Sequence, residues 1–251
     1  MPTTDKKRLE EEEYLSAEDI RSYLRWRVYF FLLIQIILGT FVIWSIFNFE
    51  TLFTILQNNL DVLYIAELTA FLGLFILSMF EEVRCDSECG SPVNLVTLAI
   101  FSLALAIHAC GTIYYYTSEQ IWFAALVTGL AFLGLSQIAF HSSNDFYVAG
   151  GNAVMFTYIF RLVTHIFSDN STLVFAFKIL NLLITCVDII SDTQALKFVQ
   201  CSDYVLSCAN LYFNIFHMYS CTLDLMPMSN QDSPTFITMI KQLVSLDFTG
   251  I

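Results

Sequence analysis

Seven apolar stretches fill most of this 251-residue chain. They lie near residues 28–47, 60–80, 93–115, 121–140, 146–167, 172–193 and 203–225. A helix needs about 20 residues, at about 1.5 Å each, to cross a hydrocarbon core of about 30 Å. The chain is 57% hydrophobic and 14% charged, whereas about a quarter of the residues of a soluble domain are charged. The sequence therefore predicts an all-α membrane protein, a bundle of seven transmembrane helices.

Polar segments flank the predicted bundle, which covers residues 26–226. Residues 1–25 form a polar tail with basic and acidic residues, and the run Glu10–Glu13 predicts a solvated, disordered segment. This tail lacks the apolar core of a cleavable signal peptide, so we expect the first helix to act as an uncleaved anchor. Residues 227–251 form a C-terminal tail, in which Thr235–Leu246 is weakly amphipathic and is expected to lie on the membrane surface or under the bundle.

Basic residues near the ends of the stretches predict the orientation in the membrane. Six Lys and Arg residues precede the first stretch, Arg84 lies in the second loop and Lys197 in the sixth. Loops one, three and five contain neither residue type. Because cytosolic loops carry an excess of Lys and Arg, the N-terminus is predicted to be cytosolic. The lipid bilayer is the expected surrounding, and no nucleic-acid partner is expected.

Ionisable side chains inside the apolar stretches are candidate functional residues, because a charge at membrane depth costs at least a few kcal/mol. One group lies nearer the middle or the luminal half of the stretches and consists of Glu67, His108, Arg161 and His165. These side chains could form a structural ion pair between helices or take part in permeation. A buried ion pair is not by itself a sign of transport, so both interpretations stay open.

Asp188 and Asp192 form a second group, near the predicted cytosolic end of the sixth stretch. Their spacing of four residues places them on one helix face, about 6 Å apart. Like charges at this distance disfavour double ionisation, so the pair can share a proton, attract a cation, or do each at different pH. Alternatively, Asp192 is solvated at the helix end or caps the next loop. Catalysis by two carboxylates needs them to converge on one substrate bond, and both lie on one helix; we expect no enzyme activity and no resident cofactor.

Five motifs follow one another along the chain. They are Ile20-Arg21 with Arg27-Val28-Tyr29 and Gln35, Ser91-Pro92-Val93-Asn94-Leu95, Asn144-Asp145-Phe146 with Gly150-Gly151, Asp192-Thr193-Gln194, and Ala209-Asn210-Leu211-Tyr212-Phe213-Asn214-Ile215-Phe216. In this order, on seven apolar stretches, they resemble the Bax-inhibitor or lifeguard family of seven-span membrane proteins. The resemblance covers residues 20–225, nearly all of the apolar part.

The resemblance implies a protein of an internal membrane that lets calcium leak from a store, or that modulates channels and death signalling there. The endoplasmic reticulum or the Golgi is the expected membrane, with other endomembranes or the plasma membrane as alternatives. In the family, the Asp of Asp-Thr-Gln pairs with a second Asp of the last helix to form a proton-sensitive latch over the pore. The matching positions here are Asp192 and Asn214.

Asn214 departs from the family pattern, because an amide can form hydrogen bonds but does not titrate. Either Asp188 supplies the second carboxylate, or Asp192 and Asn214 form a tie that does not titrate. We therefore expect a calcium-leak channel or a modulator of calcium homeostasis that regulates cell death or stress, with weakened pH gating. The alternative is a non-conducting membrane adaptor that regulates apoptosis or channels through protein partners, with apoptosis-regulating or channel membrane proteins as those partners.

Overall fold

The computed structural model of the chain describes residues 3–59, 61–80, 83, 92–142, 171–198 and 203–226. Within these residues the regular structure is helical: α1 (Thr3–Asn48), α2 (Glu50–Asn58), α3 (Asp61–Met79), α5 (Pro92–Ile113), α6 (Ser118–His141), α8 (Ser171–Ala195) and α9 (Tyr204–Asp224). Five helices in the described part are long and apolar enough to cross a membrane: Asp19–Asn48 of α1, α3, α5, α6, and Val174–Ala195 of α8. The predicted all-α membrane protein is confirmed. The count of seven spans and the cytosolic N-terminus stay predictions, and the predicted span at 146–167 lies outside the described residues.

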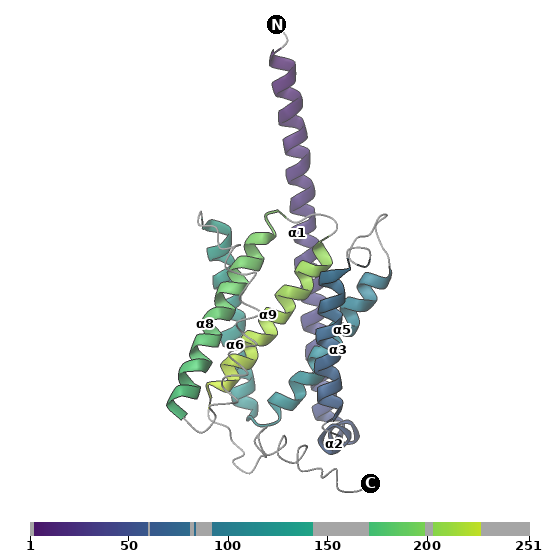
Figure 1. Ribbon diagram of the computed structural model, residues 1–251, viewed down its shortest axis with the longest axis vertical. Coiled ribbons are helices and arrows are strands. Elements are labelled where there is room, and N and C mark those ends of the chain that lie inside the picture. The colour runs from purple at the N-terminus through teal and green to yellow at the C-terminus, as the bar shows by residue number, and fades with distance from the viewer. Residues whose placement is uncertain are drawn as a thin grey trace, which may run out of the picture.

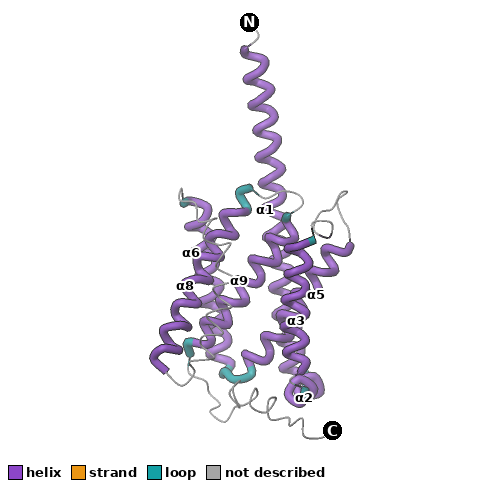
Figure 2. The backbone as a smooth tube through the Cα atoms, in the orientation of Figure 1, coloured by secondary structure: helices purple, strands orange, loops and turns teal. Residues whose placement is uncertain are grey.

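The long helices lie side by side in one bundle, and α9 runs through its middle (Figure 1). It contacts α1, α3, α5, α6 and α8. We call the end at which residues 196–203 connect α8 to α9 the near end, and the end that carries α2 and residues 114–117 the far end (Figure 2). Under the predicted orientation, the near end is cytosolic and the far end luminal.

Helix α9 matches the predicted last stretch, but it is absent from the five apolar spans. The reason is its content of buried polar side chains, which include Asn214, His217 and Ser220. Polar groups buried away from water need protein partners. The central position of α9 supplies those partners, because helices surround it on several sides.

Helix α1 begins at Thr3, so the predicted disordered tail is wrong in this respect: the run Glu10–Glu13 lies within a continuous helix of 46 residues. At about 1.5 Å per residue such a helix is about 69 Å long, and its N-terminal part projects well beyond the bundle (Figure 1). Glu, Lys, Arg and Leu dominate this part, and these residue types favour helix. Packing against the bundle begins further along, with Leu24, Val28 and Leu32 in the core.

Helix α2 is an amphipathic segment that the sequence reasoning left within a loop. At nine residues it is too short to cross a membrane, and Figure 1 shows it end-on at the foot of α3. Phe53 packs against Phe47 of α1 and Tyr114 after α5, with ring centroids 5.7 and 5.5 Å apart. Leu52 and Ile55 are exposed, which is typical of a helix lying at the membrane surface.

The core joins α1, α3 and α5 to one side of α9. Phe101 of α5 is buried and meets Tyr212 of α9 edge-to-face, with ring centroids 6.2 Å apart. A polar tie crosses the same layer: Gln35 Nε2 of α1 donates to Ser102 Oγ at 2.7 Å, and Cys208 Sγ donates to Gln35 Oε1 at 3.0 Å. These contacts fix the rotation of α9, so that Asn214 and His217 meet α8. The C-terminal tail, with Thr235–Leu246, lies outside the described residues.

Candidate functional site

One face of α8 carries a row of polar side chains through an otherwise apolar helix. Asn181, Thr185, Asp188 and Asp192 follow one another at spacings of four, three and four residues, which place them along one side of a helix. The first three are buried and Asp192 is half-buried. The row extends over about 16 Å, at about 1.5 Å per residue. We call the contact between this row and α9 the polar interface.

At the near end of the polar interface, Asp192 is bound to Asn214. The Asn214 Nδ2 group donates to Asp192 Oδ2 at 2.7 Å. Asn214 is itself buried, so the bond joins the last turn of α8 to the middle of α9. A hydrogen bond from an amide to a carboxylate is charge-assisted and short when the carboxylate is ionised. The two positions that the family resemblance pairs are therefore in contact, with an amide in place of the second carboxylate.

Asp188 lies one turn deeper on the same face of α8 and is 4% exposed. Within the described residues its carboxylate has no hydrogen-bond partner. At a spacing of four residues the Cβ atoms of Asp188 and Asp192 are about 6 Å apart, in a poorly solvated interface where a second negative charge is costly. Binding a cation or sharing a proton therefore stabilises the Asp188–Asp192 pair relative to two ionised carboxylates without a counter-charge.

Deeper in the polar interface, a second polar contact joins α8 to α9. Asn181 Nδ2 lies 3.2 Å from His217 Nε2 and 3.2 Å from Cys221 Sγ. His217 Nε2 lies 3.6 Å from Cys221 Sγ, and its ring stacks on Phe213 at 5.9 Å. His217 is 3% exposed. The sequence did not single out Asn181 or His217; the one available signal was an imidazole inside the last apolar stretch, three residues after Asn214.

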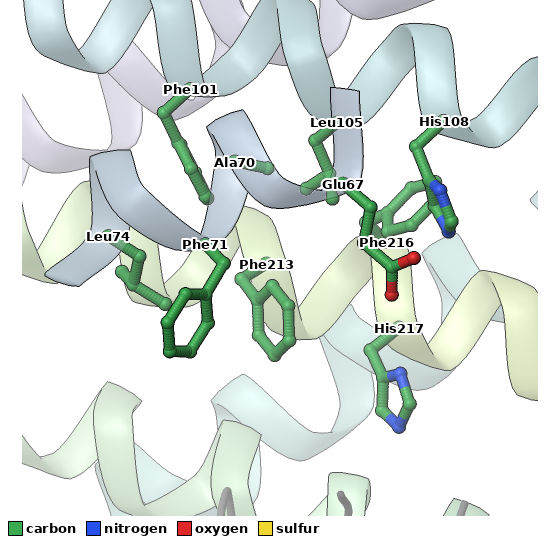
Figure 3. Close-up of a pocket in the computed structure, with 10 residues that line it drawn as sticks. All are labelled: Glu67, Ala70, Phe71, Leu74, Phe101, Leu105, His108, Phe213, Phe216 and His217. Carbon is green, nitrogen blue, oxygen red and sulfur yellow. The ribbon is translucent and has the colours of Figure 1, made fainter. Parts of the chain in front are cut away.

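The predicted group of Glu67, His108, Arg161 and His165 is partly described. Glu67 of α3 and His108 of α5 line one cavity, and His217 of α9 lines it too (Figure 3). Glu67 is exposed and His108 half-buried, and the His108 ring meets Phe216 edge-to-face at 6.3 Å. Arg161 and His165 lie outside the described residues, so the pairings proposed for them stay predictions.

The described residues contain no group of three or more His, Cys, Asp and Glu side chains that could hold a metal ion. Asp188 and Asp192 by themselves offer two carboxylates at one end of the polar interface. Stable calcium sites in proteins use six to eight oxygen ligands. The pair therefore does not form a closed calcium site in the described part, and transient passage of calcium past it stays a prediction.

Comparison with known proteins places the sequence in a family. The family model for inhibitor of apoptosis-promoting Bax1 matches residues 21–232. The Golgi anti-apoptotic protein of vaccinia virus strain Lister is 28% identical over 214 residues, which cover 84% of this chain and 86% of the viral protein. Protein lifeguard 4 of Mus musculus is 24% identical over 201 residues, which cover 79% of this chain and 81% of the mouse protein. No solved structure matches the chain.

The family match includes each described residue of the polar interface, from Asn181 to Cys221. It also covers the five apolar helices from residue 21 onward. The resemblance drawn from the five motifs is confirmed. This chain belongs to the Bax inhibitor family, to which the lifeguard proteins also belong.

Proposed function

We propose that this protein regulates cell death from an internal membrane, as a calcium-leak channel or a modulator of calcium homeostasis. The family match supports the regulatory part, as do relatives named Golgi anti-apoptotic protein and lifeguard 4. The viral relative's name favours the Golgi as the membrane, with the endoplasmic reticulum as the second choice. Calcium is proposed as the permeant ion, and no resident cofactor is proposed.

The hydrogen bond from Asn214 to Asp192 is the observation that carries this proposal. A cation that passes between α8 and α9 at the near end meets the Asp192 carboxylate, and then Asp188 one turn deeper. Two opposite unit charges 4 Å apart near a protein surface attract each other by about 4 kcal/mol. A divalent ion is attracted more strongly, and it can compete with the Asn214 amide for the same carboxylate.

The amide at position 214 sets the expected response to pH. Two carboxylates that share a proton lose their bond when that proton leaves, whereas an amide donor keeps its hydrogen through the physiological range. Opening of the α8–α9 contact should therefore depend on thermal separation or on a cation, with Asp192 as the charged partner. We infer a leak with weak pH dependence.

The test is calcium efflux from liposomes that hold the purified protein, measured from about pH 5 to about pH 8. The native protein should leak more than empty liposomes with a nearly flat pH profile, and Asp192→Asn should leak several-fold less. Asn214→Asp restores two facing carboxylates and should make the leak steeply pH-dependent. If the native protein leaks no more than empty liposomes, the channel proposal is wrong.

Asn210→Asp is the matched control for Asn214→Asp. It places the same new charge on α9, one turn nearer the near end, at a half-buried position that does not bond Asp192. We expect its pH profile to follow that of the native protein. A steep profile in both variants would show that any added charge on α9 alters the leak, and it would remove the special role of position 214.

A non-conducting adaptor is the second candidate, and the same contact favours it. The Asn214 amide does not titrate and can donate to Asp192 whether the carboxyl group is ionised or protonated, so the contact holds α8 and α9 together across the physiological pH range, as expected of a helix bundle with a scaffolding role. The adaptor would regulate apoptosis or channels through membrane-protein partners. Partners that co-purify equally with the native protein and with Asp192→Ala, without any calcium leak, would support it; loss of those partners in Asp192→Ala would count against it.

A further inference from the structure

A small cavity lies between α3, α5 and α9, away from the Asp192–Asn214 contact. Its volume is about 30 Å³, enough for water. Aromatic rings form much of its wall, and its ionisable lining consists of Glu67, His108 and His217 (Figure 3). An aromatic wall with one carboxylate and two imidazoles is well suited to hold a proton.

The three ionisable residues lie at one depth of the bundle. Glu67 is six residues after the start of α3, His108 is five residues before the end of α5, and His217 is seven residues before the end of α9. At about 1.5 Å per residue, all three lie about 8 to 11 Å from the far end. Figure 3 shows the Glu67 carboxylate between the two imidazole rings in that view. Glu67 is exposed and His217 is buried, and both line the cavity.

The hydrogen bond of His217 shows which state the site now holds. With the Asn181 amide in this orientation, Nδ2 donates and His217 Nε2 accepts, an arrangement that requires a neutral ring. A proton added at Nε2 would set two donors face to face. The Asn181 amide can then rotate so that its Oδ1 atom faces the ring, because within the described residues Oδ1 has no hydrogen-bond partner to lose. Protonation of His217 is therefore coupled to the side-chain orientation on α8.

Among the described residues, the ionisable groups that line the cavity or contact His217 come from three elements. Glu67 faces it from α3, His108 from α5, and Cys221 from its own helix. α1 has no ionisable residue from 30 to 48, and α6 has none from 120 to 140.

On α8, three ionisable groups lie nearest in sequence to Asn181. Lys178 donates to the backbone carbonyl of Asp224 at 2.8 Å, at the far end. Cys186 and Asp188 lie five and seven residues beyond Asn181, toward the near end. Within the described residues, Glu67 is therefore the carboxylate that shares the cavity with His217.

We propose that this cavity is a proton-binding site, in which His217 takes up a proton from the far-end side of the membrane and pairs with Glu67. Histidine is the side chain whose charge ordinarily changes between about pH 5 and pH 8. The charged imidazole attracts the Glu67 carboxylate, which draws α3 toward α9, and it turns the Asn181 amide of α8. The site is a second polar contact of α9, made with residues other than Asp192 and Asn214 and nearer the far end.

Nuclear magnetic resonance of the full protein, labelled at histidine Cε1 and held in lipid nanodiscs, tests the proposal. The signal that disappears in His217→Gln belongs to His217, and it should move between about pH 8 and about pH 5. In Glu67→Gln the same change should need a pH lower by about half a unit or more, because the facing charge is gone. Glu67→Asp keeps that charge and should retain the native behaviour.

His141 provides the internal control, since its ring is exposed at the near end of α6. Its signal should be the same in the native protein and in Glu67→Gln at each pH. A His217 signal that stays constant over the whole range would overturn the proposal. So would a His217 response that is the same in the native protein, Glu67→Gln and Glu67→Asp, since it would show that Glu67 is not the partner.

Discussion

Removing the amide of Asn214 should cost measurable stability, and only while Asp192 is present. Asn214→Leu keeps the size and branching of the side chain but removes the donor to Asp192 Oδ2. A hydrogen bond to a charged group contributes about 1.5 to 3 kcal/mol in water-soluble proteins, and hydrogen bonds between membrane helices contribute up to about 1.7 kcal/mol. Because Asp192 is half-buried and not fully enclosed, we expect a coupling of about 1 to 2 kcal/mol between the two residues.

A double-mutant cycle in detergent micelles measures this coupling. The unfolding free energy is compared for the native protein, Asp192→Leu, Asn214→Leu and the double variant. Asn214→Leu alone should destabilise by about 2 kcal/mol, since it leaves the Asp192 carboxylate without its donor, and the double variant should lose much less than the sum. Asn210→Leu, paired with Asp192→Leu, is the control and should be additive. Additivity of Asp192→Leu and Asn214→Leu to within about 0.3 kcal/mol would refute the bond's energetic role.

Three further outcomes can be checked on the purified or membrane-inserted protein. Gly39→Ala directs a methyl group at the Tyr212 hydroxyl and should lower the free energy of unfolding by about 1 to 3 kcal/mol. In Gly129→Ala the methyl group points into open space, so the unfolding temperature should stay the same or rise. Equal effects of the two variants would contradict this packing. Burial raises the pKa of the Tyr116 hydroxyl, and the nearby charge of Asp224 adds to this effect. The neutral hydroxyl therefore contributes its full stabilisation below about pH 10, and this contribution is lost as the pH rises further. Tyr116→Phe should therefore lessen the alkaline loss of thermal stability, and an unchanged loss would exclude Tyr116 as its source. A tag at the N-terminus should react with an impermeant reagent added outside sealed microsomes, while protection of that tag would reverse the predicted orientation.

Apolar periodicity predicted the long helices well, because membrane-spanning helices are defined by their own length and composition. The ends of α3, α5 and α6 lie within a few residues of the stretches at 60–80, 93–115 and 121–140. The nine-residue helix α2 was not predicted, because an amphipathic segment of that length resembles a loop in sequence. The helical start of α1 at Thr3 was not predicted either. The high charge of this segment indicated disorder, although its Glu, Lys, Arg and Leu residues also favour helix.

The candidate site depends on tertiary contacts, and these were only partly visible in the sequence. Spacing placed Asp188 and Asp192 on one face, and the family resemblance named Asn214 as the position opposite Asp192. No local sequence pattern indicates that α9 lies in the middle of the bundle, so His217 was treated as an ordinary residue of an apolar stretch. Its contact with Asn181, 36 positions away, and its place in one cavity with Glu67 emerge only when α3, α8 and α9 are brought together.

The order in which the chain leaves the ribosome gives the central position of α9 a consequence for biogenesis. α9 is synthesised after the other described helices, yet it carries the partners of Asp192 and Asn181 and touches α1, α3, α5, α6 and α8. Helix α9 is too polar to be stable alone in lipid, so it has to insert against helices that are already in the membrane. Until then, the row on α8 faces lipid or water with its hydrogen bonds unmade. A chain truncated before Tyr204 would remain in this unfinished state, exposed to the quality-control machinery of the membrane in which it was made.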